Sequence, residues 1–552
     1  MNILSKIPLD WWKNSVFYQI YPRSFYDADN NGIGDLKGIT QKLDYLNDGQ
    51  GGGLGIDAIW VSPFFKSPMK DFGYDVSDFC DVDPIFGTMA DFDEMTEACH
   101  QRGIKILVDL VLNHCSDLHP WFQESRKDRT NQKADWFVWE EKAADGGPPN
   151  NWIGVFGGSA WEYEPKRDQY YLHNFLKEQP DLNWYNTEVQ QAMREIIRFW
   201  LKKGVDGFRL DTANFYAFDQ KLRDNPKLPD DHPSLENRDG IDYDKYDACF
   251  SKDRPENFEF LNIIRSTIDE QESHATTIGE IGGIQNLDRL IELASSYVKG
   301  DQHLHMAYTF SLIGTRLDAT SIANIIGLTE THIEDGWPCW SFGNHDSTRI
   351  KSRCKAQMDV EFFQENLMLL LLCLRGTPII YYGEELGMTE YAIKKEELQD
   401  PFGITYWPSY PGRDGCRTPF PWGHKQHAQG FNLSHKPWLP ATSTVSLDQQ
   451  TDDLTSMFTL TKTMIEIRKK HPALAFGDFK EIKLTVDLYV FQRTYRSQTI
   501  IIACNFGNSS QNIKIGIKHG KQLIIPAFQR NGKWINESME LPPYGFSILI
   551  QE

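Results

Sequence analysis

The feature that most restricts the fold of this chain is a series of short apolar runs separated by amphipathic segments. The runs are mostly uninterrupted, as expected of strands that are buried on both faces of a parallel sheet. They lie at residues 16–25, 56–63, 105–112, 207–213, 276–281, 305–310, 338–344 and 377–385. Between two of them, residues 187–204 have the pattern of an amphipathic helix, with caps at Asn186–Thr187 and Gly204. Such β/α units predict an α/β fold, a closed (β/α)₈ TIM barrel.

Two stretches depart from this alternation. Residues 114–183 are irregular and rich in Trp, Asp, Gly and Pro, and they are too long for a simple loop, so they predict a subdomain inserted after the third strand. After residue 474, short strand-like runs with polar turns predict an antiparallel β-sandwich over 475–552. The barrel would then be built from residues 1–113 and 184–474.

Three carboxylates follow strand-like runs. They are Asp211 in GFRLD, Glu280 in TTIGEI and Asp346 in SFGNHD. In a (β/α)₈ barrel the carboxyl ends of the strands meet at one face, and that face holds the active site. Breaking a glycosidic bond needs a nucleophile, a proton donor and a group that tolerates a positively charged sugar. The sequence therefore predicts a glycosidase site at these three residues.

Arg209 lies two residues before Asp211 and therefore shares its strand face. We expect Arg209 to keep Asp211 ionised as a nucleophile, although a structural ion pair is the alternative. Glu280 lies in an apolar strand end, where burial and neighbouring carboxylates should raise its pKa and make it a general acid. A helix-capping glutamate is the alternative. A retaining glycosidase would place the two carboxyl groups about 5–5.5 Å apart.

Further polar residues sit at predicted strand ends. His114 and His345 each follow an Asn, an arrangement that suits hydrogen bonds to sugar hydroxyls. Zinc is the alternative, but the sequence lacks a His/Cys cluster at ligand spacing. Asp75 and Arg349 could form a bidentate pair that grips the terminal hydroxyls of a sugar.

Residues 27–35, DADNNGIGD, have the oxygen spacing of a calcium loop. Gly32 would allow the turn, while Gly38 at the twelfth position excludes a complete EF-hand. The predicted ligands are Asp27, Asp29, Asn31, the carbonyl of Ile33, and Asp35. We expect a structural Ca²⁺, with Mg²⁺ as the second choice, and no organic cofactor. A plain Asp/Asn/Gly turn is the alternative.

Amino-acid composition limits the classes of molecule that we expect the protein to bind. A formal charge of -20, from 57 basic and 77 acidic residues, disfavours nucleic acid and anionic membranes and is compatible with a neutral small-molecule substrate. The 9 cysteines are an odd number without a C-x-x-C pair, which indicates reduced thiols. The N-terminus lacks a signal-type apolar region, and the longest apolar run, 367–374, is too short to span a membrane. These features predict a cytoplasmic protein and leave its oligomeric state open.

Taken together, these motifs resemble the α-amylase superfamily, glycoside hydrolase family 13, in its α-glucosidase and oligo-1,6-glucosidase branch. The resemblance covers roughly the first four-fifths of the chain. It rests on WWKNSVFYQIYPRSFYDADNNGIGDLKGI, GIDAIWVSP, DLVLNH, QPDLNW, GFRLD, GEI, NHD and YYGEELG.

The resemblance implies that Asp211 is the nucleophile, Glu280 the acid/base and Asp346 the stabiliser of the distorted sugar. It implies that Tyr74 is a stacking platform under the non-reducing-end glucose. Further residues would line the same pocket: Arg209, His114, His345, Asp75 and Arg349. It also supports the metal at 27–35.

Three features bear on specificity within the branch. In this branch, Thr at the position of Thr212 accompanies a preference for α-1,4 linkages, whereas Val accompanies a preference for α-1,6 linkages. The insert at 234–265 resembles one in α-1,4-specific bacterial members, whereas Gly343 is less usual and leaves the pocket wall there open. The expected activity is exo-acting, retaining hydrolysis of terminal α-1,4-linked glucose from maltose and short α-glucosides.

The alternatives use the same scaffold. They are a sucrose or maltose isomerase, a glucosyltransferase, and an oligo-1,6-glucosidase. A fourth, from a different class, is a non-catalytic protein like the amino-acid transporter heavy chains, which carry a membrane segment and lose catalytic carboxylates. This chain keeps all three carboxylates.

Overall fold

The computed structural model describes residues 10–229, 232, 241–270, 274–354, 359–515, 520–535 and 537–551. The sequence motif at 234–265 therefore lies partly outside the described residues, which resume at 241.

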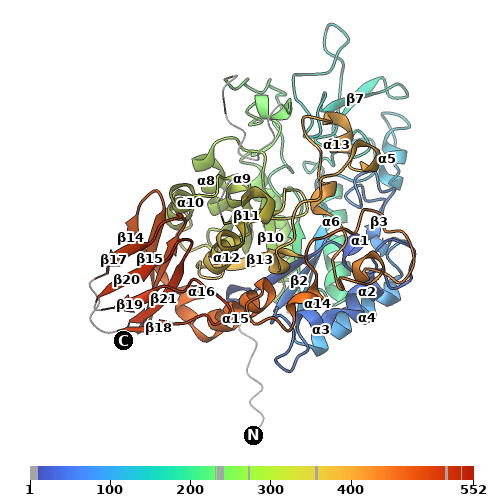
Figure 1. Ribbon diagram of the computed structural model, residues 1–552. Coiled ribbons are helices and arrows are strands. Elements are labelled where there is room, and N and C mark those ends of the chain that lie inside the picture. Colours follow the sequence, from blue (N-terminus) through green and yellow to red (C-terminus); the bar gives the residue numbers. More distant parts are fainter. Residues whose placement is uncertain are drawn as a thin grey trace.

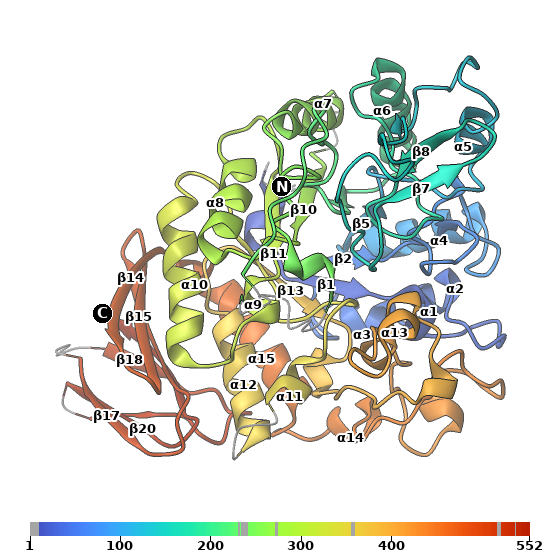
Figure 2. The same ribbon diagram turned by 90° about the horizontal axis from the view of Figure 1, so that it is seen from above.

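Parallel strands form the barrel at the centre of the molecule (Figure 2). In sheet order they run β11-β10-β9-β5-β2-β1-β13-β12, and a parallel bridge between Ala307 and Pro338 joins the two outermost strands. This confirms the predicted (β/α)₈ barrel, and each of its strands falls within one of the predicted runs. The strands are β1 (Phe17–Ile20), β2 (Ala58–Val61), β5 (Lys105–Leu110), β9 (Gly207–Leu210), β10 (Thr276–Ile281), β11 (Met306–Thr309), β12 (Cys339–Trp340) and β13 (Thr377–Tyr381).

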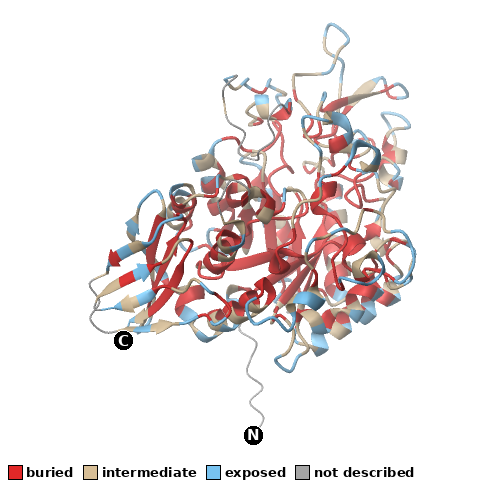
Figure 3. Cartoon of the chain, viewed as in Figure 1, coloured by how far each residue is buried: buried red, intermediate tan, exposed pale blue. Residues whose placement is uncertain are grey.

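The strands are buried on both faces, which explains their uninterrupted apolar sequence (Figure 3). Phe17, Trp60 and Leu107 belong to a core cluster drawn mainly from the strands, whereas their neighbours Tyr18 and Ile59 pack with the surrounding helices. Successive strand residues thus alternate between the barrel interior and the helix layer. The longer helices are α4 (Met89–Gln101), α6 (Thr187–Lys202), α7 (Asn257–Asp269), α8 (Leu287–Val298), α10 (Ala319–His332), α12 (Val360–Leu371) and α15 (Met457–Lys470).

Helix α6 shows how local sequence sets an element. The side chain of Asn186 accepts a hydrogen bond from the N–H of Glu188, so it is the N-cap that the sequence predicts. Gly204, just past the helix, has φ +90°, a conformation that glycine adopts without strain. The shorter α-helices are α1 (Pro22–Phe25), α2 (Leu36–Gln41), α3 (Leu43–Leu46), α5 (Pro120–Ser125), α9 (Ser311–Gly314), α11 (Ile350–Arg353), α13 (Pro401–Tyr406), α14 (Leu447–Gln450) and α16 (Pro472–Phe476). The 3₁₀ turns are η1 (Trp11–Asn14), η2 (Tyr243–Lys245), η4 (Glu384–Leu386), η5 (Lys395–Glu397), η6 (Asp414–Cys416) and η7 (His427–Gly430).

The region after β5 contains a small antiparallel sheet of its own. Its strand order is β6 (Trp139–Glu140), β8 (Gln169–Leu172), β7 (Trp161–Glu164). A further hairpin, β3 (Phe65–Lys66) with β4 (Asp78–Val82), follows β2. Both lie beyond the carboxyl ends of barrel strands, where insertions shape the site.

The C-terminal region folds into two antiparallel sheets, drawn in red in Figure 1. The first has the order β14 (Asp478–Leu484), β15 (Leu488–Tyr495), β16 (Gln498–Asn505), β21 (Phe546–Gln551), β18 (Gly520–Leu523). The second has the order β17 (Gln511–Lys514), β20 (Ser538–Leu541), β19 (Lys533–Ile535). Val490 and Leu549 of the first sheet share a core with Ile513 and Met539 of the second, as the predicted β-sandwich requires.

Candidate active site

A cavity of about 780 Å³ opens at the carboxyl ends of the barrel strands. Six of the residues predicted from sequence line it: Tyr74, His114, Asp211, Thr212, Glu280 and Asp346. Arg209 and His345 lie behind this lining and contact its carboxylates. The structure thus brings the three predicted carboxylates into one pocket.

One fully buried guanidinium holds the nucleophile and acid candidates together. Arg209 Nη1 lies 2.7 Å from Asp211 Oδ1, and Nη2 lies 2.5 Å from Glu280 Oε2. The same Nη1 lies 2.7 Å from Asp109 Oδ1, a carboxylate that sequence reasoning missed. Asp109 pairs in register with Arg209 across β5 and β9, so the barrel itself sets this contact.

Three carboxylates share that single cation, and burial raises the pKa of each. The pKa of Glu280 rises to about 8, with the charges of Asp211 and Asp346 adding to burial while Arg209 opposes both. The pKa of Asp211 rises to about 7, and that of Asp109 to about 6, through burial against the pull of Arg209. Glu280 therefore holds a proton near neutral pH, as predicted. Arg209 lowers the pKa of Asp211, but burial outweighs this effect and the charges of Asp109 and Asp346 add to burial.

Asp346 has the opposite environment. Its Oδ1 lies 2.7 Å from Arg417 Nη2 and 3.1 Å from Arg413 Nη1. Burial raises the pKa of Asp346, but the interactions with His345, Arg413 and Arg417 outweigh it and hold the pKa well below its ordinary value. Asp346 is therefore ionised whenever the protein is folded at ordinary pH.

His345 lies next to Asp346 and is neutral. Burial lowers its pKa well below the ordinary value, since the ring is completely enclosed. Gln19 Nε2 lies 2.7 Å from Nδ1, so Nδ1 accepts and the proton is on Nε2. That nitrogen lies 2.5 Å from the hydroxyl of Tyr74 and 3.3 Å from Asp346 Oδ2. The rings of Tyr74 and His345 also stack, so His345 positions Tyr74 at the pocket wall.

The predicted clamp between Asp75 and Arg349 was wrong. Asp75 accepts hydrogen bonds from the hydroxyl of Ser67 and from the backbone N–H groups of Lys70 and Asp71, which organise a turn. Arg349 donates to the carbonyl of Tyr382. Neither of the two side chains lines the cavity, and each is held by hydrogen bonds to backbone groups.

Asp71 and Arg413 form the clamp instead, and both line the cavity. Arg413 Nη2 lies 2.7 Å from Asp71 Oδ1 and 2.8 Å from Asp400 Oδ1, while Nη1 reaches Asp346. Asp71 could have been found as a second Asp in KDFGYD, four residues before Asp75. Arg413 lies in an irregular segment after β13, where no periodic pattern marks it.

His114 and Gln179 continue this polar end of the cavity. Their Nε2 atoms lie 3.1 Å apart, and Gln179 also donates to Asp71 Oδ2 at 3.3 Å. Burial lowers the pKa of His114 to about 3, so it is neutral. The cavity lining also includes aromatic and apolar side chains, namely those of Phe156, Phe175, Phe215, Phe310, Ile313, Leu317, Phe402 and Tyr410.

Thr212 lies outside strand β9, which ends at Leu210, and has φ +44°. A β-branched residue in this region is strained, and such strain collects at functional sites. Its backbone N–H donates to Glu280 Oε2 at 3.2 Å, and its hydroxyl donates to Asp211 Oδ2 at 3.3 Å. Thr212 thus touches both reacting carboxyl groups.

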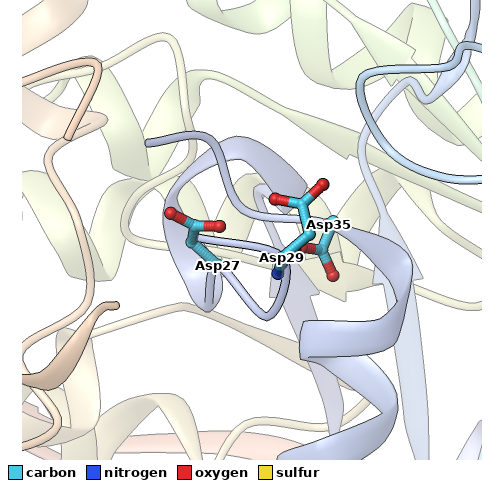
Figure 4. A group of neighbouring side chains, drawn as sticks. All are labelled: Asp27, Asp29 and Asp35. Carbon is cyan, nitrogen blue, oxygen red and sulfur yellow. Dashed lines mark hydrogen bonds between the residues drawn. The ribbon is translucent and has the colours of Figure 1, made fainter. Parts of the chain in front are cut away.

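The loop at 27–35 gathers three carboxylates, Asp27, Asp29 and Asp35, whose ligand oxygens lie within 4.8 Å of one another (Figure 4). In the part of the chain that the structure describes, this is the one such group of His, Cys, Asp or Glu side chains, so His114 and His345 are not part of a zinc cluster. Burial raises the pKa of Asp29 and of Asp35, and carboxylate neighbours raise both further. The oxygen-only donor set fits a hard dication.

The other two predicted ligands lie in the same turn. The side-chain oxygen of Asn31 accepts the N–H of Ile33 at 2.8 Å. Gly32 between them has φ +98°, and a Cβ there would come within 2.5 Å of the carbonyl oxygen of Lys436. The turn therefore requires glycine at this position.

Across the described residues, no helix combines the length and the apolar character needed to span a lipid bilayer.

The chain matches known families over nearly its whole length. Residues 19–477 match the α-amylase catalytic domain, and residues 477–524 match the α-amylase C-terminal domain. A probable α-glucosidase of Rhizobium meliloti is 43% identical, with 97% of this chain and 96% of the relative covered. An oligo-1,6-glucosidase of Parageobacillus thermoglucosidasius is 36% identical, with 96% of each chain covered.

A solved structure of an α-glucosyl transfer enzyme superposes with a TM-score of 0.92 at 41% identity, covering 98% of this chain and 99% of that one. The match of the catalytic domain, the barrel and the gathered carboxylates agree. The chain belongs to the α-amylase family, in the branch of the α-glucosidases and oligo-1,6-glucosidases, and is a glycoside hydrolase.

Proposed function

We propose that this protein is an exo-acting, retaining α-glucosidase that removes terminal α-1,4-linked glucose from maltose and short α-glucosides. The observation that carries this proposal is the attachment of Asp211 and Glu280 to the two ends of one guanidinium. Carboxyl groups held side by side in this way favour the retaining spacing of about 5 Å over the wider gap that an inverting enzyme needs for a water molecule.

In this mechanism the non-reducing-end glucose occupies the polar end of the cavity, where Asp71 and Arg413 can bind its hydroxyls. Glu280 gives its proton to the glycosidic oxygen while Asp211 attacks the anomeric carbon, so the C–O bond breaks and a glucosyl ester forms. Glu280, now ionised, takes a proton from water, which attacks the ester and releases α-glucose and free Asp211. Ionised Asp346 favours the positive charge that develops on the sugar.

The ion-pair network around Arg413 supports exo action. Arg413 joins Asp71, Asp346 and Asp400 into one network behind the expected terminal sugar. The rest of the substrate would then lie against the aromatic residues of the lining. Cleavage would therefore release one glucose at a time.

Glucosyl transfer is the second candidate. It uses the same ester but passes glucose to a sugar or another alcohol, and an isomerase would return it to the departing sugar. The similarity to an α-glucosyl transfer enzyme and the aromatic residues in the cavity lining favour this candidate. Chromatography of products at high maltose and high sucrose separates the two, because hydrolysis gives free glucose and transfer gives new glucosides.

A substrate panel tests the main proposal. Initial rates on maltose, isomaltose, sucrose, trehalose and p-nitrophenyl α-glucoside should rank maltose above isomaltose, and early proton NMR spectra should show α-glucose first. The variant Asp211→Asn is the inactive control, and its kcat should be several orders of magnitude below that of wild type. Release of β-glucose first, or near-normal activity of Asp211→Asn, would contradict the assignment.

We also propose a structural Ca²⁺ or Mg²⁺ held by Asp27, Asp29 and Asp35, with Asn31 and the carbonyl of Ile33 completing the site. The ion would balance three carboxylates that lie close together. A cytoplasmic location stays part of the proposal, and the nine free thiols support it.

A further inference from the structure

A buried ion pair lies close to the catalytic residues but outside the cavity lining. The side chains of Lys252 and Asp253 are 1% and 3% exposed, and Nζ lies 2.8 Å from Oδ2. They belong to the segment that leads into helix α7. Removing two charges from water is costly, and such pairs contribute little to stability compared with apolar packing. The contacts of this pair indicate a role in the arrangement of the site.

Asp253 is hydrogen-bonded to the loop that carries the nucleophile, Asp211. Its backbone N–H donates to the carbonyl of Asn214 at 2.9 Å, and its Oδ1 accepts from Asn214 Nδ2 at 2.6 Å. Asn214 is three residues beyond Asp211 and is completely buried. The loop after β9 is therefore fixed to Asp253 through both the backbone and the side chain of one residue.

Lys252 is hydrogen-bonded to the loop that carries the acid, Glu280. Its Nζ donates to the carbonyl of Gly282 at 3.1 Å, two residues after Glu280. Asn214 Nδ2 donates to the same carbonyl at 3.0 Å. Gly283, with φ +70°, packs so closely that a Cβ there would lie 3.1 Å from Cε of Lys252.

The two loops also meet directly, since the N–H of Ala213 donates to the carbonyl of Glu280 at 3.0 Å. We propose that Lys252 and Asp253 are positioning residues that brace this junction and so hold Glu280 and Asp211 at their working separation. The inference rests on the proposed hydrolase mechanism. Retaining chemistry depends on that separation, and a misplacement of about 1 Å can cost about 100-fold in rate.

The test compares Lys252→Met and Asp253→Asn with a control at another largely buried ion pair. Lys252→Met keeps the length of the side chain, and Asp253 retains Arg289, whose Nη2 lies 3.6 Å from Oδ2, as a partial counter-ion. Asp253→Asn is isosteric and serves if the first variant does not fold. The control is Glu330→Gln, which breaks the pair between Glu330 and fully buried Arg493 of the C-terminal sheets.

Kinetics provide the first readout. On maltose, both variants should lose about 100-fold in kcat while KM stays within about twofold. On 2,4-dinitrophenyl α-glucoside, whose leaving group needs no proton, Lys252→Met should lose much less, because Lys252 acts on the loop of the acid. The control should be less stable but keep the wild-type kcat on both substrates. Variants that lose stability alone, as the control does, would overturn the proposal.

Hydrogen exchange provides the second readout and does not depend on activity. Amides in peptides covering 211–215 and 280–284 should exchange faster in Lys252→Met and Asp253→Asn than in wild type. In the control these peptides should be unchanged. If wild type fails to cleave any α-glucoside, the proposed function fails while exchange still decides the bracing. Unchanged exchange in both loops would refute the bracing itself.

Discussion

At the scale of single residues, we expect the hydroxyl of Thr212 to influence the choice between α-1,4 and α-1,6 linkages. It donates to the nucleophile at 3.3 Å, a contact that valine would lack while filling nearly the same volume. We expect Thr212→Val to raise kcat/KM on isomaltose relative to maltose. Thr212→Ser keeps the hydroxyl and should keep the ratio. An isomaltose preference in wild type would contradict the prediction; an unchanged ratio in Thr212→Val would assign linkage choice to the surrounding loops.

We expect the ionisation of Glu280 to determine where kcat/KM falls at alkaline pH. Its pKa, raised to about 8 by burial, means that the acid form is present below pH 8 and is lost above it. Asp211 must be ionised, so the acid side should fall as pH drops through about 7. The expected profile of kcat/KM is a narrow bell. With 2,4-dinitrophenyl α-glucoside, Glu280→Gln should lose the alkaline limb, and a limb that persists would assign that proton elsewhere.

At the scale of elements, the loop 27–35 should depend on a divalent ion. A ligand that binds only the native state stabilises it by about 2.7 kcal/mol at 100 times its Kd. EDTA should therefore lower the Tm of wild type. In Asp29→Asn, which removes one carboxylate of the cluster, the shift should shrink, whereas Asp128→Asn, in an exposed turn, should keep it. A melting curve that EDTA leaves unchanged would argue for a plain turn.

At the scale of the whole molecule, Glu330 of helix α10 joins the barrel to the C-terminal sheets. Its Oε1 lies 2.6 Å from Arg493 Nη1, and its Oε2 lies 3.0 Å from Arg375 Nε. Glu330→Gln should lower the free energy of unfolding by about 3 kcal/mol, because it leaves a buried guanidinium without its charge partner. Denaturant unfolding measures this. The control Glu466→Gln affects an exposed pair and should cost about 0.5 kcal/mol or less.

The sequence by itself determined the barrel, the C-terminal β-sandwich and the positions of three carboxylates at strand ends. These follow from local patterns: strands buried on both faces are uninterrupted apolar runs, and Asp211, Glu280 and Asp346 follow such runs directly. The cap of helix α6 at Asn186 is equally local.

Only the tertiary structure decided which charged side chains lie in contact with one another. Asp71 and Arg413 are 342 positions apart, and no periodicity links an irregular segment to a turn after β2. Asp75 and Arg349 have the side-chain types expected of a sugar clamp, but both are hydrogen-bonded to backbone groups instead. The division of Arg209 among three carboxylates likewise depends on the register of β5, β9 and β10. A side chain's contacts and pKa depend on what folding brings within a few ångströms, and sequence distance does not encode that.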